Sequence, residues 1–220
     1  MRLSEHPRHR RVGRAVMAAG LAVAVTVLTA TGAASKPPET VDPATMTPAL
    51  NPDFAPWTCV KKGDGIICDG EWEPSYSEPT GVQCDGRAVW LTGGGREVAR
   101  RWHTAEGLAT RTSVRLEYPH DVFSFDPSGE GAGDDAELVV SGRFHRFYTY
   151  PVPGDLAYRV LTEKGLIYLG KVDGRVVFVD AGTVEFAPGQ DFEVITEMRG
   201  RHDVYEDPGL IDRVICETLT

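Results

Sequence analysis

The sequence lacks the short motifs that mark most catalytic centres. It contains no G-x-S-x-G elbow for a nucleophilic serine, no H-x-x-x-H spacing for a metal site and no E-x-D-x-x-E pattern of the kind found in sandwich-type glycosidases. Its four cysteines have spacings that match no common zinc module. These absences leave the catalytic residues unassigned, and we expect neither a metal nor another cofactor.

The sequence also lacks an apolar run long enough for a typical membrane-spanning helix. The run Ala15–Ala30 has 16 residues, whereas a spanning helix needs ~20. It follows an arginine-rich stretch and precedes the small residues Gly32-Ala33-Ala34-Ser35, which is the arrangement of a cleaved secretory signal peptide. We therefore predict a signal peptide over residues 1–34 and a secreted or cell-envelope location. An uncleaved membrane anchor is the alternative.

Acidic residues outnumber basic ones, and the imbalance grows beyond the leader. The whole chain carries 23 basic and 32 acidic residues, a net charge of −9. Residues 1–34 hold five of the basic residues and one of the acidic residues, so the rest of the chain has a net charge of −13. Such a surface repels nucleic acid and anionic lipid. We expect no nucleic-acid partner and, once the leader is cleaved, no membrane partner.

Residues 35–56 are rich in proline. Each proline fixes its own φ and biases the preceding residue toward extended structure. We predict that this segment is an extended or disordered tether and that one domain, residues 57–220, follows it. The prolines are Pro37, Pro38, Pro43, Pro48, Pro52 and Pro56.

The four cysteines are expected to form two disulfides, because an even number of cysteines in an exported chain is typical of a disulfide framework. Gly63-Asp64 has the composition of a two-residue type II′ turn, which places Cys59 opposite Cys68 on a non-hydrogen-bonded pair of a hairpin. This register favours a Cys59–Cys68 bond and leaves Cys84 to Cys216. The alternative is Cys68–Cys84, because both residues occur in similar C-D-G sequences.

Alternation of apolar and polar residues dominates from position 57 to about 201 and predicts antiparallel strands. One strand is predicted over 110–118, where Pro119-His120-Asp121 ends it, and the longest is predicted over 138–150. About ten short strands separated by turn signals predict an all-β fold, an antiparallel β-sandwich or jelly roll. An up-and-down β-barrel is the alternative.

Two further patterns refine this fold. Asp173-Gly174 is a type I′ turn signal, which predicts a hairpin with Leu169 opposite Phe178. Both faces of that hairpin are largely apolar, so we expect it to be covered on both sides. After Pro208-Gly209 the apolar residues recur every three or four positions, which predicts one short C-terminal helix. Separate short strands are predicted over residues 156–162, 166–172, 183–187 and 192–199.

Few side chains are candidates for chemistry. His145 lies between two arginines on an aromatic-rich strand, and a lone strand histidine is usually half-exposed or hydrogen-bonded. Glu193 and Glu197 share a strand face, but their Cα atoms would be about 13–14 Å apart, a loose fit to an inverting carboxylate pair. The acidic loop at 126–135 has the composition of a calcium site without the EF-hand pattern. Each of these groups is more simply explained as solvated surface.

Aromatic residues form the remaining candidate site. Flat rings stack on sugar faces, and exported sandwich domains with exposed aromatics often bind sugars. The same rings serve equally well to fill a core. The residues concerned are Trp57, Trp72, Trp90 and Trp102, with the cluster Phe144, Phe147, Tyr148 and Tyr150.

The general plan resembles exported proteins of unknown function that are common in high-GC actinobacteria. The resemblance covers residues 57–220 and is carried by W-T-C at 57–59, C-D-G at 68–70, C-D-G-R at 84–87, V-P-G-D at 152–155 and I-C-E at 215–217. These motifs are turns and cysteines, so the resemblance implies the disulfide-bonded β domain and transfers no catalytic residue.

Two functions remain open from the sequence. The first is an exported non-catalytic β domain that binds a glycan or an extracellular surface partner, and it predicts an aromatic-lined face without converging acids. The second is a secreted carbohydrate-active hydrolase, which predicts two carboxyl groups about 5–10 Å apart across a cleft.

Overall fold

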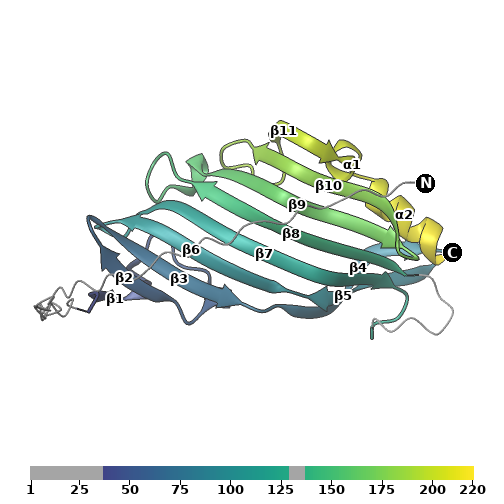
Figure 1. The fold of residues 1–220 in the computed structure, drawn as a ribbon, viewed down its shortest axis with the longest axis horizontal. Helices are drawn as coiled ribbons and strands as arrows, with labels where there is room; N and C mark the ends of the chain where they lie inside the picture. Colours follow the sequence, from purple (N-terminus) through teal and green to yellow (C-terminus); the bar gives the residue numbers. More distant parts are fainter. Residues whose placement is uncertain (1–36, 129–136) are drawn as a thin grey trace, which may run out of the picture. The chain divides into compact units, whose positions relative to one another are not determined.

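The protein is described by a computed structural model covering residues 37–128 and 137–220. In these residues eleven strands form one open antiparallel sheet, followed by two short C-terminal helices (Figure 1). The predicted all-β class and the C-terminal helix are confirmed. The elements are β1 (Thr40–Val41), β2 (Thr58–Lys62), β3 (Gly65–Trp72), β4 (Ser75–Cys84), β5 (Arg87–Gly94), β6 (Arg96–Thr104), β7 (Ala109–Ser124), β8 (Leu138–Thr149), β9 (Val160–Val172), β10 (Arg175–Phe186), β11 (Ile195–His202), α1 (Asp203–Glu206) and α2 (Leu210–Leu219).

The strands follow one another as an up-and-down series within this single sheet. The order is β1-β2-β3-β6-β7-β8-β9-β10-β11, while β4 pairs with β5, which also pairs with β7. Strands β3 and β4 together run along β6 and β5 as one long hairpin, whose turn at Asp85-Gly86 has positive φ at both residues, as a type I′ turn requires. The predicted strands therefore lie side by side in one layer.

Several predicted strand ends are wrong because the strands continue through irregularities. β7 does not stop at Pro119. Its pairing with β8 shifts between Tyr118 and Asp121, and this bulge leaves Pro119 and His120 outside the paired register. The missing N–H of proline therefore breaks no ladder hydrogen bond. In the same way, residues 160–162 and 166–172 belong to one strand, β9, and 183–187 falls largely within β10. The start of the strand predicted over 156–162 is wrong, because Leu156–Tyr158 forms a 3₁₀ turn.

The hairpin β9–β10 has the predicted turn but a different register. Asp173 and Gly174 both have positive φ, as expected for type I′. However, a shift after Val176 places Phe178 opposite Gly170 instead of Leu169. A Cβ atom on Gly170 would lie 2.3 Å from the Phe178 ring, so the glycine provides the space in which that ring is buried. Val176 and Val177 are exposed, so the expectation that this hairpin is covered on both sides is wrong.

Both disulfides join the cysteines that the hairpin register predicted. Cys59 and Cys68 are directly opposite in β2 and β3, with Cα atoms 4.0 Å apart. Cys84, at the end of β4, is bonded to Cys216 of α2 across 132 positions of the chain. Two disulfides indicate an oxidising environment. None of the helices in the described part of the chain is long and apolar enough to span a membrane.

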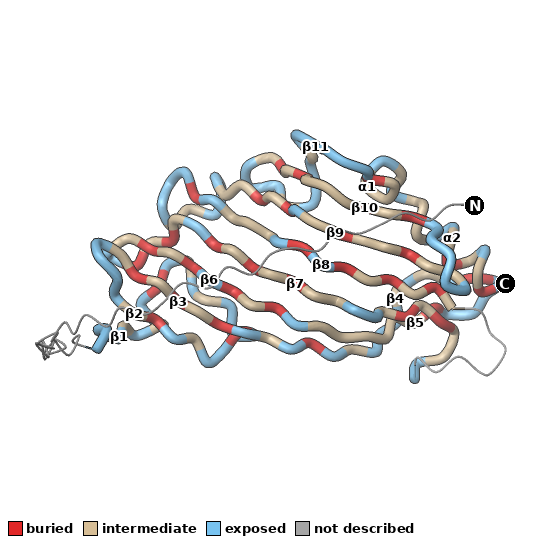
Figure 2. Tube along the Cα trace, in the orientation of Figure 1, coloured by how far each residue is buried: buried red, intermediate tan, exposed pale blue. Residues whose placement is uncertain are grey.

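One face of the sheet is covered and carries the core, and we call it the covered face. Figure 2 shows buried positions recurring along the central strands, as expected when alternate side chains point to opposite faces. Helix α2 packs over one end of this face, the helix-covered end. The buried residues there are Cys84, Val89, Leu138, Val140, Phe178, Ile215 and Leu219.

The other end of the covered face is overlaid by the proline-rich segment, so the prediction of a tether there is wrong. The buried side chains Met46 and Phe54 anchor this segment to the sheet. Two short 3₁₀ turns, at Pro43–Thr45 and Pro52–Phe54, begin with an acceptor side chain before a proline. Asp42 and Asn51 each accept a backbone N–H at 3.0 Å, a cap followed by proline at the first helical position. These two capped turns hold Pro43 and Pro52 in folded structure instead of an extended tether.

Candidate functional site

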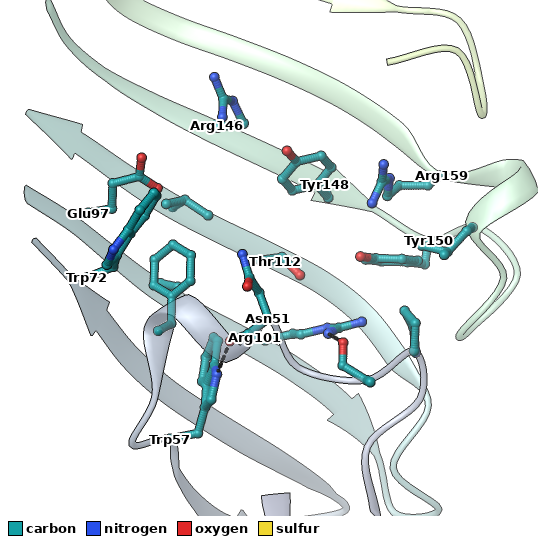
Figure 3. A pocket seen from close by; sticks show the side chains of 16 residues that line it. Asn51, Trp57, Trp72, Glu97, Arg101, Thr112, Arg146, Tyr148, Tyr150 and Arg159 are labelled. Atoms are coloured by element: carbon teal, nitrogen blue, oxygen red, sulfur yellow. Dashed lines mark hydrogen bonds between the residues drawn. The ribbon is translucent and has the colours of Figure 1, made fainter. Parts of the chain in front are cut away.

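A pocket of about 390 Å³ lies between the proline-rich segment and the covered face (Figure 3). Its volume falls within the usual range for small-molecule sites. We call this region the pocket end. The lining comes from the segment (Pro48, Ala49, Asn51, Phe54) with Trp57 directly after it, from the sheet (Trp72, Glu97, Ala99, Arg101, Thr112, Val114, Arg146, Tyr148) and from the β8–β9 connection (Tyr150, Leu156, Arg159).

The register of the central strands brings the polar lining together. Arg101 of β6 lies opposite Thr112 of β7, which lies opposite Tyr148 of β8. Two residues along, Val114 pairs with Arg146 in the same manner. Because every second residue points to the same face, these side chains reach one pocket although they come from positions far apart in the sequence.

Arg101 is the most unusual of these side chains. It is 6 % exposed, and its Nη1 donates to the carbonyl of Ala49 at 3.1 Å. Its Nε and Nη2 are buried and have no hydrogen-bond partner. Burial lowers its pKa from the usual range, the phenol of Tyr150 acts in the opposite direction and the charge of Arg159 lowers it further. An arginine still retains its proton under these conditions, so a buried positive charge lies in the pocket wall.

The other two arginines of the pocket have acidic partners. Arg146 donates through Nε to Glu163 at 2.8 Å, and the second oxygen of Glu163 accepts from Tyr205 at 2.6 Å. Burial alone would lower the pKa of Arg146, but the charge and hydrogen bond of Glu163, together with Tyr148 and Glu97, outweigh it, so the pKa is raised. Arg159 forms an ion pair with Asp191. Both charges are therefore balanced within the protein.

Aromatic rings form much of the pocket wall. Figure 3 shows Trp57 and Trp72 on one side and Tyr148 and Tyr150 on the other. The ring of Phe54 lies 5.7 Å from that of Trp57 and 6.0 Å from that of Trp72. The indole N–H of Trp57 donates to the carbonyl of Asn51 at 2.8 Å, which fixes the plane of the ring.

The four tryptophans are divided between the two faces. Trp57 and Trp72 line the pocket, whereas Trp102 packs beneath the guanidinium of Arg111 on the opposite face, 5.0 Å from it. Trp90 follows buried Val89 in β5 and so points away from the covered face. The sequence left open whether the aromatics fill the core or line a groove, and two of the four tryptophans line the pocket.

Glu97 is the one carboxylate that lines this pocket within the described residues. It is 6 % exposed and accepts a hydrogen bond from Tyr118. Burial, followed by the bond to Glu97, raises the pKa of Tyr118 well above its usual value, so the phenol stays a donor. A carboxylate pair of the kind used in glycoside hydrolysis needs a second acid facing the same space.

The residues considered from sequence lie elsewhere. His145 is exposed and stacks on Phe147, with ring centroids 5.7 Å apart. Glu193 lies in the turn before β11 instead of in a strand, and Glu197 of β11 is paired with Arg199. None of these three lines the pocket.

The remaining predicted features fall largely outside the described residues. These are the signal peptide over 1–34 and most of the acidic loop proposed for calcium, positions 129–135. Among residues 37–128 and 137–220, no group of three metal-ligating side chains comes together.

Sequence reasoning missed Arg101 and the proline-rich wall opposite it. The sequence signal for Arg101 is the alternation along β6, where every second residue is buried. This alternation places the charged Arg101 on the buried face together with Glu97, Ala99 and His103. His103 is also buried, and this burial together with the charge of Arg101 lowers its pKa to about 4. It is therefore neutral at physiological pH.

Comparisons of the chain with protein-family models, with curated proteins and with solved structures give no match. The pocket itself is therefore the basis for any statement about function.

Proposed function

We propose that this chain is an exported, non-catalytic β domain that binds a glycan in the pocket between the proline-rich segment and the sheet. The supporting observation is the chemistry of the lining. Aromatic rings alternate with hydrogen-bonding groups, and Val114 and Leu156 are the two branched aliphatic side chains among the sixteen lining residues. Rings that stack on C–H faces, together with polar groups that bind hydroxyls, suit a sugar better than an acyl chain.

Export is the part of the proposal supported by the two disulfides, because such bonds persist in oxidising compartments. The arginine-rich leader with its small-residue cleavage site supports the same conclusion.

A glycan array tests the binding proposal. The disulfide-bonded chain should bind a defined subset of glycans, and Trp57→Ala or Trp72→Ala should weaken that binding at least about tenfold. Trp102→Ala is the matched control, since it removes an indole from the opposite face. Unfolding midpoints should accompany each measurement. Binding that survives both pocket substitutions but is lost with Trp102→Ala would contradict the proposal.

A secreted carbohydrate hydrolase is the second candidate, and buried Glu97 in the pocket is the observation that favours it. It takes second place because Glu97 is the single lining carboxylate in the described residues and is engaged by Tyr118. Release of reducing ends from the glycans that bind, abolished by Glu97→Gln, would reverse this order.

A further inference from the structure

We infer that the glycan is acidic, and that a carboxylate of a uronic acid unit pairs with Arg101. This inference rests on the proposed glycan-binding function and adds the chemical class of the ligand and the residue that selects it. Three observations carry it: the free edge of the Arg101 guanidinium, the balance of the other charges, and the chemistry of the neighbouring wall.

The free atoms of Arg101 lie on the edge that binds carboxylates. Nη1 is occupied by the carbonyl of Ala49, whereas Nε and Nη2 are unpartnered. Together Nε and Nη2 form the two parallel N–H donors that pair with the two oxygens of a carboxylate. The guanidinium is therefore held by one nitrogen, and its bidentate edge is left unpaired in the pocket wall.

Arg101 is also the pocket arginine that forms no ion pair within the described residues, and Glu97, the lining carboxylate, is engaged by Tyr118. Glu163 neutralises Arg146, and Asp191 neutralises Arg159. The ion pairs of the described residues leave Arg101 without an acid. One unpaired guanidinium matches a monoanion such as a carboxylate. A phosphate monoester, which carries about −1.5 to −2 charges at pH 7, would leave negative charge buried.

The wall beside Arg101 suits the hydroxyl groups of a sugar. Thr112 lies opposite Arg101, and its Oγ1 is buried without a hydrogen-bond partner. Tyr148 lies in the same wall, and Asn51 lies in the proline-rich wall that faces it (Figure 3). A carboxylate on Arg101 would place the neighbouring ring hydroxyls beside these groups and the ring faces beside the indoles. A fatty acid would bring the same carboxylate but would find few aliphatic contacts.

Matched sugar pairs that differ in one carboxylate give the sharpest test. Calorimetric titration of the disulfide-bonded chain should use short oligomers of glucuronic, galacturonic and mannuronic acid beside the corresponding oligomers of glucose, galactose and mannose. We expect at least one acidic oligomer to bind, and its neutral counterpart to bind at least about 30-fold more weakly, as expected for loss of one buried charged pair. Decanoate is included as an acidic lipid.

Two variants separate recognition from folding. Arg101→Met removes the charge and keeps the length of the side chain, so affinity for the acidic oligomer should fall at least about 30-fold while the unfolding midpoint stays the same or rises. A purely structural arginine would instead lower the midpoint. Arg100→Met is the control, because Arg100 is the adjacent residue, faces the other side of the sheet and is paired with Asp69. It should leave affinity unchanged.

The outcomes separate failure of the acidic-ligand inference from failure of the glycan-binding function. Equal binding of an acidic and a neutral oligomer, with no effect of Arg101→Met, would overturn the acidic-ligand inference and keep the glycan-binding function. Tight binding of decanoate, lost in Arg101→Met, with no binding of any sugar would overturn both. No binding of any acidic oligomer would overturn the inference, and the glycan array would then decide the proposed function separately.

Discussion

The two ends of the covered face are covered in different ways, and the difference explains why the pocket lies at one end only. At the helix-covered end, α2 packs apolar side chains against the sheet and is bonded to β4 through Cys216. At the pocket end, an irregular segment crosses the same face and leaves a space with a charged wall. A regular amphipathic helix presents a continuous apolar stripe that fills such a face. A segment of capped turns and prolines touches it at a few anchors and leaves room for a ligand.

Breaking the covalent link at the helix-covered end should have the largest effect on stability. In the loop-entropy account, a bond that closes 132 positions contributes about 4–5 kcal/mol. The double substitution Cys84→Ser and Cys216→Ser should lower the free energy of unfolding by that order, measured by chemical denaturation. Removal of Cys59–Cys68, which closes 9 positions, should cost about 3 kcal/mol. An equal or larger loss at Cys59–Cys68 would contradict the loop-length explanation.

Truncation of one core side chain at each end should show that one end is filled and the other is open. Ile215→Ala leaves a closed cavity among apolar neighbours and should cost about 3 kcal/mol. Phe54→Ala borders the existing pocket, so its cost should be limited to lost burial, about 2 kcal/mol. Denaturant titration of both variants measures the difference. A markedly greater loss for Phe54→Ala would mean that the pocket end is packed more tightly than the lining indicates.

Acid should destabilise the pocket end through His103. Its pKa falls from 6.5 to about 4 on folding, so the unfolded chain binds a proton that the folded chain excludes. This contribution is complete above about pH 6.5 and is lost as the pH falls toward 4, by at most about 3 kcal/mol.

His103→Met should remove this part of the pH dependence. Asp180, whose pKa burial raises to about 6, acts with the opposite sign, so the informative quantity is the difference between the two proteins. Parallel stability curves for the variant and the parent between pH 7 and 4 would show that His103 is not protected from protonation.

An effect no larger than that of Phe54→Ala is expected for the network that neutralises Arg146. Tyr205→Phe removes the hydrogen bond to the second oxygen of Glu163 and should cost about 2 kcal/mol, because a buried carboxylate oxygen loses its donor. Thermal unfolding measures this loss. Ligand affinity should change little, since Arg101 is untouched. Tyr168→Phe is the control, because it removes a hydroxyl from a neighbouring ring that has no bond to Glu163.

Local signals in the sequence predicted the elements whose geometry depends on near neighbours. The turn at Gly63-Asp64 fixed the hairpin register and with it Cys59–Cys68, and the three-to-four period predicted α2. The predicted strand end at Pro119 is wrong because a bulge lets β7 continue past it. A bulge depends on the partner strand, which local sequence does not specify. The tether predicted over 35–56 is also wrong for residues 37–56, where Asp42 and Asn51 cap folded turns.

By itself, the sequence determined the strand content, the turns and the C-terminal helix and favoured the observed cysteine pairing, because each depends on periodicity or on residues close together in the chain. The tertiary structure alone decided that the strands lie in one sheet, that the proline-rich segment covers it and that Arg101, Thr112 and Tyr148 meet in one pocket. The physical reason is that the pocket requires the register of three strands and a wall from a distant segment. A charge without an ion-pair partner is recognisable only when all its neighbours are in place.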